Sequence, residues 1–139
     1  MTLSFIQACD NDRAYLLSLR KLTMLEHFEK SGLFLTDSQH AFRLNDAYDC
    51  FYLIHHGDDV IGALKYQEMP DYFEIMQLQI HPNYQGKGFG SKVMHAVIEQ
   101  ARPKYLTLTV LKANPAIKLY QRLGFIITGE DEFEYWMRK

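Results

Sequence analysis

The sequence predicts one domain, residues 1–139, with a mixed α/β fold: a central mixed sheet with helices on both faces, in the order β-α-α-β-β-β-α-β-α-β-β. Short runs rich in β-branched and aromatic residues alternate with segments whose apolar residues recur at helical spacing. Composition agrees, because 47% of the 139 residues are hydrophobic and 14% are aromatic, which is enough to fill a core.

The first half of the chain is predicted to hold a strand, a long helix, a short helix and a hairpin, over residues 3–8, about 11–30, within 33–46, and 48–55 with 60–67. Asp10 or Asn11 is the expected N-cap of the long helix, and Gly32 its expected end. The apolar stripe of this helix comprises Tyr15, Leu16, Leu19, Leu22 and Thr23. The pattern of residues 33–46 is ambiguous, with Asp37 or Ser38 as the candidate cap.

The second half alternates strands and helices, over residues 72–80, 88–101, 105–111, about 115–123, 125–128 and 133–137. Asn114 and Pro115 open the later helix as N-cap and first residue, and Gly124 ends it. The unit of strand 72–80, its helix and strand 105–111 is expected to form a right-handed parallel crossover. The hairpins on either side are antiparallel, so the sheet is mixed.

Composition also disfavours several classes of protein. A formal net charge of -2 argues against a general nucleic-acid binder. We expect neither a membrane span nor a secretory leader, because no window approaches about 18 apolar residues and residues 9–13 interrupt any signal core. Cys9 and Cys50 lack paired spacing, which favours a reduced, cytoplasmic setting. The histidines show no metal-ligand spacing, so no metal site is expected.

The segment Gln85 to Gly90 (QGKGFG) directly follows a predicted strand and opens a predicted helix. Glycines let backbone N–H groups approach a ligand, and a helix start adds free donors, so a phosphate or pyrophosphate is favoured. The segment is not a P-loop, because Gly88 occupies the Ser/Thr position, nor a dinucleotide fingerprint, because Ser91 replaces the last glycine. From spacing alone, a tight strand-to-helix turn is an equal alternative.

Two segments resemble the GCN5-related N-acetyltransferase (GNAT) superfamily. The family signature [RQ]xxGx[GA] matches Gln85–Gly90 in full, and residues 114–125 (NPAIKLYQRLGF) are similar to the family's N…A…LYxxxGF pattern. Two motifs in this order are more specific than either alone, and the predicted elements fit the family fold. The resemblance implies an enzyme that moves an acetyl group from acetyl-CoA to an amine of a small molecule or protein by direct attack, without an acyl-enzyme.

The resemblance also implies which residues meet acetyl-CoA. The loop amides would bind the CoA pyrophosphate, the preceding strand would pair its backbone with the pantetheine arm, and the two parallel strands would splay apart to admit the thioester. The implied cofactor-binding residues are Leu78, Gln79, Ile80, Gln85, Gly86, Lys87, Gly88, Phe89, Gly90, Ser91, Asn114 and Tyr120.

Tyr120 is also one of two implied catalytic residues, as the phenol that protonates the departing thiolate. The motif places it there, but Tyr120 shares a helical face with Ala116 and Leu123. A purely structural aromatic residue is therefore the alternative.

Glu74 is the other expected catalytic residue, as the general base that deprotonates the amine. On a regular strand it shares one face with three apolar residues, Met76, Leu78 and Ile80. Its surroundings also resemble those of the base glutamate in the histone-acetylating branch of the family. A bulge in the strand would shift this parity. The alternatives are a solvated charge at Glu74, with His81, Glu68 or a water chain acting as base.

The acceptor amine is not predicted, because acceptor choice lies in segments with little signature. Acidic residues near the expected pocket and the C-terminus would attract a cationic amine, or are simply solvated; they are Glu26, Glu29, Asp37, Glu130, Asp131, Glu132 and Glu134. A non-catalytic acyl-CoA sensor is the competing function. The aromatic residues Phe133, Tyr135 and Trp136 suit either the core or a homodimer interface.

Overall fold

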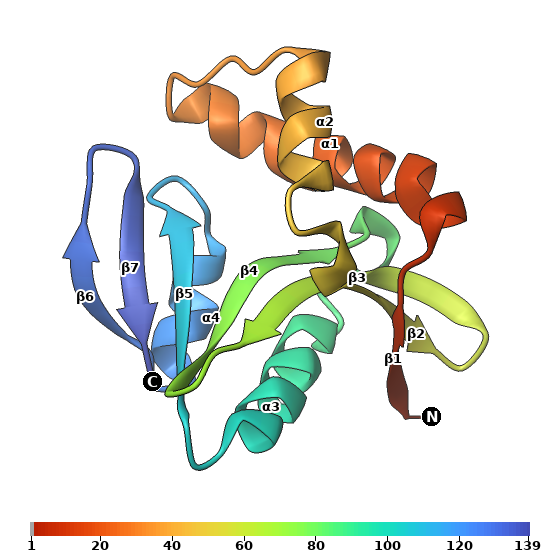
Figure 1. Ribbon diagram of the computed structural model, residues 1–139. Helices are drawn as coiled ribbons and strands as arrows, with labels where there is room; N and C mark the ends of the chain where they lie inside the picture. The colour runs from red at the N-terminus through yellow and green to blue at the C-terminus, as the bar shows by residue number, and fades with distance from the viewer. Residues whose placement is uncertain (1) are drawn as a thin grey trace.

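The computed structural model describes residues 2–139, which form a seven-stranded sheet and four α-helices (Figure 1). In chain order the elements are β1 (Leu3–Gln7), α1 (Arg13–Lys30), α2 (Asp37–Asn45), β2 (Phe51–His56), β3 (Asp59–Glu68), β4 (Tyr72–Ile80), α3 (Phe89–Ala101), β5 (Tyr105–Leu111), α4 (Ala116–Arg122), β6 (Ile126–Glu130) and β7 (Glu134–Arg138). Short 3-10 turns precede α1, β2 and α3. The predicted order of strands and helices is confirmed.

The strands lie in the order β1-β2-β3-β4-β5-β7-β6. β4 and β5 pair in parallel, and every other neighbouring pair is antiparallel. The sheet is therefore mixed, as predicted, and the parallel pair stands at its centre with α3 as the connection.

Helices cover both faces of the sheet (Figure 1). On one face α3 and α4 pack against the strands. The buried residues of α3 form an apolar stripe of Phe89, Val93, Met94, Val97 and Ala101. On the other face α1 and α2 pack on β2 and β3 through Leu16, Leu19 and Leu44. Leu22, predicted in the stripe of α1, is instead 57% exposed, and Arg20 takes a buried place on that helix. The two helical layers leave the middle of the sheet accessible from the α1/α2 side.

The caps of the first two helices differ from the predictions. Neither Asp10 nor Asn11 caps α1; the Asp12 carboxylate accepts a hydrogen bond from the Cys9 N–H at 2.8 Å, and a 3-10 turn precedes the helix. In α2 the cap is Thr36 rather than Asp37 or Ser38. The Thr36 hydroxyl accepts from the Gln39 N–H, while the Gln39 side chain accepts from the Thr36 N–H, which makes a reciprocal capping box.

β2 begins at Phe51, three residues later than predicted. Ala47 adopts a positive φ of 51°, and Tyr48 to Cys50 form a 3-10 turn. The Tyr48 hydroxyl donates to the Cys9 carbonyl at 2.7 Å, so this segment is tied to the start of α1 instead of extending the strand.

Within residues 2–139 no helix is both long and apolar enough to span a bilayer. Cys9 and Cys50 carry free thiols. β6 is the edge strand at the C-terminal side of the sheet, and Ile126 and Trp136 are exposed there. The homodimer stays a prediction.

Candidate active site

β4 and β5 separate part of the way along their length, as the family resemblance implied. They pair through residues 72–75 and 105–108, and no pairing follows. β4 continues to Ile80 and β5 to Leu111, so the second half of each strand faces an opening. An opening between two parallel strands exposes backbone groups that a ligand can pair with.

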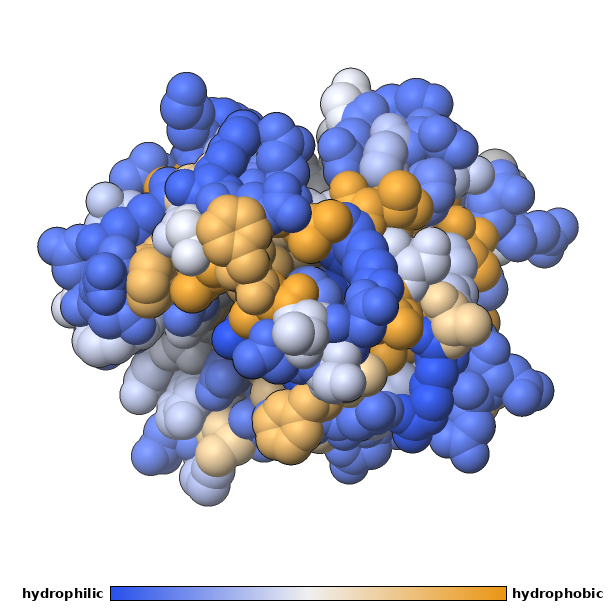
Figure 2. Space-filling model, turned by 90° about the horizontal axis from the view of Figure 1, so that it is seen from above, coloured by the Kyte–Doolittle hydropathy of each residue, from blue (hydrophilic) through white to orange (hydrophobic). Residues whose placement is uncertain are grey.

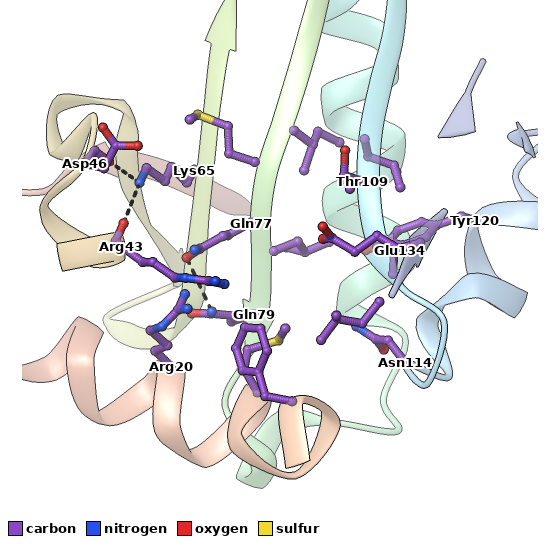
Figure 3. Close-up of a pocket in the computed structure, with 18 of the residues that line it drawn as sticks. Arg20, Arg43, Asp46, Lys65, Gln77, Gln79, Thr109, Asn114, Tyr120 and Glu134 are labelled. Atoms are coloured by element: carbon purple, nitrogen blue, oxygen red, sulfur yellow. Dashed lines mark hydrogen bonds between the residues drawn. The ribbon is translucent and has the colours of Figure 1, made fainter. Parts of the chain in front are cut away.

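A cavity of about 290 Å³ lies at this opening, on the α1/α2 side of the sheet. That volume lies near the lower end of the range of ligand sites, about 300–1,000 Å³. In the close-up, side chains from α1, α2 and β3 lie on one side of β4, and Thr109, Glu134, Tyr120 and Asn114 lie on the other (Figure 3). From above, apolar residues gather in the middle of this face and hydrophilic residues surround them (Figure 2). We call this hollow the cleft.

A second hollow of about 210 Å³ adjoins the cleft and is lined by His27, Gln85, Gly90 and Leu119 among others. The two hollows share lining residues, which are Met24, Leu78, Gln79, Asn114 and Tyr120. The second hollow therefore connects the glycine loop to the cleft, and we call it the channel.

A bulge in β4 overturns the predicted face of Glu74. Lys65 on β3 pairs with Gln77, but the next residue of β3 pairs with Ile75, so Met76 is an extra residue on β4. Before the bulge Phe73 and Ile75 pack in the core beneath α3; after it Leu78 and Ile80 do so. Glu74 therefore does not share a face with Leu78 and Ile80.

Glu74 also lies away from the cleft. It stands beside Thr107 in a separate hollow that Tyr105 and Trp136 line, and it lines neither the cleft nor the channel. The structure brings Tyr120 and Asn114 together, and leaves Glu74 apart from them.

The glycine loop has the backbone that the motif predicts. Gly86 and Gly88 adopt φ values of +75° and +82°, which other residues rarely adopt, and no atom lies within 4 Å of the place where a Cβ would stand. α3 begins at Phe89, so the first N–H groups of this helix have no partner within the helix. The Gln85 side chain donates to the Ile80 carbonyl at 2.8 Å and holds the loop against the end of β4. That carbonyl is consequently engaged within the protein.

The remaining loop residues differ in what they can offer a ligand. Lys87 is exposed, with its ammonium 5.8 Å from the Tyr84 ring centroid. The Phe89 side chain is buried in the core, packed edge-on against His56, so only its backbone can meet a ligand. Ser91 is partly exposed in the first turn of α3.

Asn114 and Tyr120 lie where the cleft meets the channel. The Asn114 side-chain oxygen accepts from the Ala116 N–H at 2.9 Å and so satisfies the first N–H of α4. The helix begins at Ala116, one residue later than predicted, with Pro115 at the N-cap position. Tyr120 is only 6% exposed and lines both hollows. Burial raises the pKa of its phenol to about 12. The hydroxyl is therefore protonated throughout the physiological pH range.

Glu134, at the start of β7, lines the cleft, although no individual role was predicted for it. Burial, followed by the nearby Asp131 carboxylate, raises its pKa. A carboxylate with a raised pKa is a better proton acceptor than an ordinary one. Its only sequence signal was membership of the acidic C-terminal group.

Three cations also line the cleft: Arg20, Arg43 and Lys65. Arg20 opens the segment 20–28 in which the family resemblance implied an acceptor pocket, but no individual role was expected for any of the three. Arg20 and Lys65 are almost completely buried, at 2% and 3% exposure. The sequence signal for Arg20 was its place four residues after Leu16, within the apolar stripe of α1.

No three metal-binding side chains come together anywhere in residues 2–139.

Comparison with known proteins agrees with this geometry. The model of the Acetyltransferase (GNAT) family matches residues 14–125. A spermine/spermidine N(1)-acetyltransferase of Bacillus subtilis is 29% identical over 150 residues, covering 96% of this chain and 93% of that protein.

Solved structures share the fold over the whole chain. An acetyltransferase from Thermus thermophilus superposes with a TM-score of 0.79 at 19% identity, covering 100% of this chain and 97% of that one. The PaiA N-acetyltransferase of Thermoplasma acidophilum, solved in complex with coenzyme A, superposes with a TM-score of 0.73 at 14% identity, covering 100% and 99%.

Proposed function

The chain belongs to the GNAT family and is an N-acetyltransferase, and from this premise we propose that it transfers the acetyl group of acetyl-CoA to an amine held in the cleft between β4 and β5. The observation that carries the proposal is the position of Tyr120, at the junction of the cleft and the channel. A thioester entering from the glycine loop would meet an acceptor in the cleft beside this residue. An enzyme is favoured over a non-catalytic sensor because the channel and glycine loop can hold acetyl-CoA while the cleft can hold an acceptor amine.

The residues present fit acetyl-CoA. The free N–H groups at the start of α3 and the open backbone of Gly86 and Gly88 suit a pyrophosphate. Beyond Ile75, β4 has β3 on one side and no strand on the other, so its backbone can pair with an extended pantetheine arm. Residues 78–80 line the channel and supply this edge. Within the single domain that we propose for residues 1–139, acetyl-CoA is thus the donor substrate.

The acceptor must lose a proton before it attacks, because an alkyl amine has a pKa near that of lysine, about 10.4. We assign the base to Glu134 in preference to Glu74, since Glu134 lines the cleft with Tyr120 and Glu74 does not. Glu134 accepts the ammonium proton and passes it to solvent. The neutral amine nitrogen then attacks the thioester carbonyl carbon, and the carbon–sulfur bond breaks with its electron pair on sulfur. The second N–H proton leaves as the amide forms and ends on water or on the released thiolate. Backbone N–H groups on the open edge of β4 would stabilise the oxyanion.

Tyr120 acts on the departing sulfur. A thiol has a pKa of about 8.5, well below that of the buried phenol, so complete proton transfer from Tyr120 to the thiolate is uphill. The phenol instead donates a hydrogen bond that stabilises the anionic sulfur as the bond breaks. This refines the proton donation that the resemblance implied.

The test is release of free thiol from acetyl-CoA with a panel of amines: polyamines, amino acids, aminoglycosides and lysine peptides. Polyamines are included because the relative from Bacillus subtilis is named for spermine and spermidine. Wild-type protein should release thiol only when its acceptor is present, and Glu134→Gln should be slower than Glu74→Gln.

Three results would contradict the proposal or one of its assignments. Tight acetyl-CoA binding by calorimetry with no turnover on any amine would favour the sensor. Absence of acetyl-CoA binding would show that the glycine loop is only a turn. A rate that falls in Glu74→Gln but not in Glu134→Gln would return the base to Glu74.

A further inference from the structure

The cleft contains more positive charge than its own carboxylates neutralise. Arg20, on α1, is 2% exposed, and its Nε donates to the Nδ1 of buried His40 at 3.0 Å. Neither Arg20 nor Arg43 forms a salt bridge with any residue in the range 2–139. A buried cation without a counter-ion is costly, so buried Arg20 is a candidate partner for an anionic ligand.

The positive charges of Arg20 and Arg43 are close enough to repel one another. In the close-up their guanidinium groups lie near each other and point into the cleft (Figure 3). Burial, followed by the charge of Arg43, lowers the pKa of Arg20 to about 10. Burial, followed by Arg20, also lowers the pKa of His40, so this imidazole is neutral and serves as the acceptor that orients Arg20. Both guanidinium groups lie over the Phe28 ring, and the charge of Arg43 partly offsets the rise that burial causes in the pKa of Glu134, without forming an ion pair with it. The pair therefore offers an anion two guanidinium groups, of which Arg20 is held in place by His40.

Lys65 has a different role. Its ammonium donates to the backbone carbonyls of Arg43 and Asp46, which tie the end of α2 to β3. Lys65 is therefore satisfied inside the protein and holds the backbone of Arg43 in place. The cations that are free to bind a ligand are Arg20 and Arg43.

The charges in the cleft are separated in space. Arg20, Arg43 and Lys65 lie on the α1/α2 side of β4, whereas Glu134 and Tyr120 lie on the β5/β7 side (Figure 3). Asp46 lies on the cationic side but is exposed and pairs with neither arginine. A ligand that matches this pattern carries an anionic end and a cationic end.

We propose that the acceptor is a small amine that also carries a carboxylate, bound with its carboxylate between Arg20 and Arg43 and its amine towards Glu134 and Tyr120. Guanidinium groups suit a carboxylate because their N–H groups match its two oxygens. The cleft volume of about 290 Å³ suits a molecule of amino-acid size. A polyamine, by contrast, would place further positive charge against the two arginines. The inference rests on the proposed acetyl transfer and names its acceptor class.

The experiment compares matched acceptors at saturating acetyl-CoA: each amino acid against its own carboxamide, with spermidine alongside. The carboxamide removes the negative charge at nearly the same size; because it also lowers the pKa of the neighbouring amine, kcat/KM is compared per concentration of free amine. We expect kcat/KM to favour the carboxylate by about 10- to 100-fold, the effect of hydrogen bonds to a charged group.

The matched variants are Arg43→Gln and Arg102→Gln. Arg43 is exposed on α2, so its replacement should leave the fold intact, which thermal unfolding will check. Arg43→Gln should remove most of the preference, mainly through KM, because it lowers kcat/KM for the carboxylate acceptors much more than for their carboxamides. Arg102 lies beyond α3, paired only with Glu99 at the surface, and its replacement should change neither rate.

The outcomes separate this inference from the proposed function. Turnover that is equal or faster on carboxamides or spermidine would overturn the carboxylate acceptor while leaving the acetyltransferase intact. An equal loss on both acceptor types in Arg43→Gln would also overturn it. No thiol release with any amine would defeat both proposals.

Discussion

Replacing Tyr120 by Phe tests how the enzyme handles its leaving group. The substitution removes one hydroxyl and keeps the buried ring that packs on Phe125. No hydrogen bond to this hydroxyl is found within residues 2–139, so its loss should not lower the stability of the ligand-free protein. Any effect on rate therefore reports the chemistry rather than the fold.

The magnitude follows from the pKa of the phenol, about 12, against about 8.5 for a thiol. Full proton transfer would be uphill by about 5 kcal/mol, because one pKa unit corresponds to about 1.4 kcal/mol. A hydrogen bond to the charged sulfur contributes about 1.5–3 kcal/mol. Tyr120→Phe should therefore lower kcat by about 10- to 100-fold.

The assay is thiol release at saturating acetyl-CoA, with acetyl-CoA affinity measured separately by calorimetry. Because the raised pKa keeps the hydroxyl protonated up to about pH 12, the ratio of wild-type to variant rates should stay constant from neutral pH to moderately alkaline pH. Tyr105→Phe, at an exposed tyrosine outside the cleft, is the matched control. An unchanged kcat in Tyr120→Phe would refute the reasoning and reduce Tyr120 to a core aromatic residue.

Three further predictions concern the base, the loop and the cap. Because burial raises the pKa of Glu134, its charged form is disfavoured in the folded state. Glu134→Gln should therefore raise the melting temperature at neutral pH, and this difference should disappear in acid, where Glu134 is protonated in both states. The variant should also lose the acid limb of the pH–rate profile. Gly90→Ala places a Cβ 3.5 Å from the Leu119 side chain, an ordinary contact, so stability should hold while acetyl-CoA affinity by calorimetry falls. Gly86→Ala, at a positive φ, should instead cost about 1 kcal/mol of unfolding free energy by denaturant titration. Thr36→Ala should cost about 1 kcal/mol and raise the acceptor KM without changing acetyl-CoA affinity, because α2 carries Arg43.

The parts of the fold that the sequence predicts best are those with strong local signals at both ends. The strands over residues 72–80 and 105–111 have the predicted bounds, because Pro70 and Pro82 bracket the first and Pro103 precedes the second. The glycine loop is equally local, since its positive φ values are a property of the glycines themselves.

The parts that were missed depend on contacts between distant segments. The bulge at Met76 shows in the sequence only as two adjacent apolar residues, Ile75 and Met76, and its effect on the face of Glu74 becomes clear from the pairing with β3. The burial of Arg20 depends on His40, which lies twenty residues further along the chain. Glu134 joins the cleft only because β7 inserts between β5 and β6.

The separation of β4 from β5 also has a mechanical consequence. The sheet has two halves, one made of β1, β2, β3 and β4 and the other of β5, β7 and β6. They are joined by four residue pairs between β4 and β5 and by the core beneath them. A molecule that pairs with the open edges of both strands links the two halves of the sheet, so part of its binding free energy stabilises their arrangement. A saturating donor should therefore raise the melting temperature and sharpen the thermal unfolding transition.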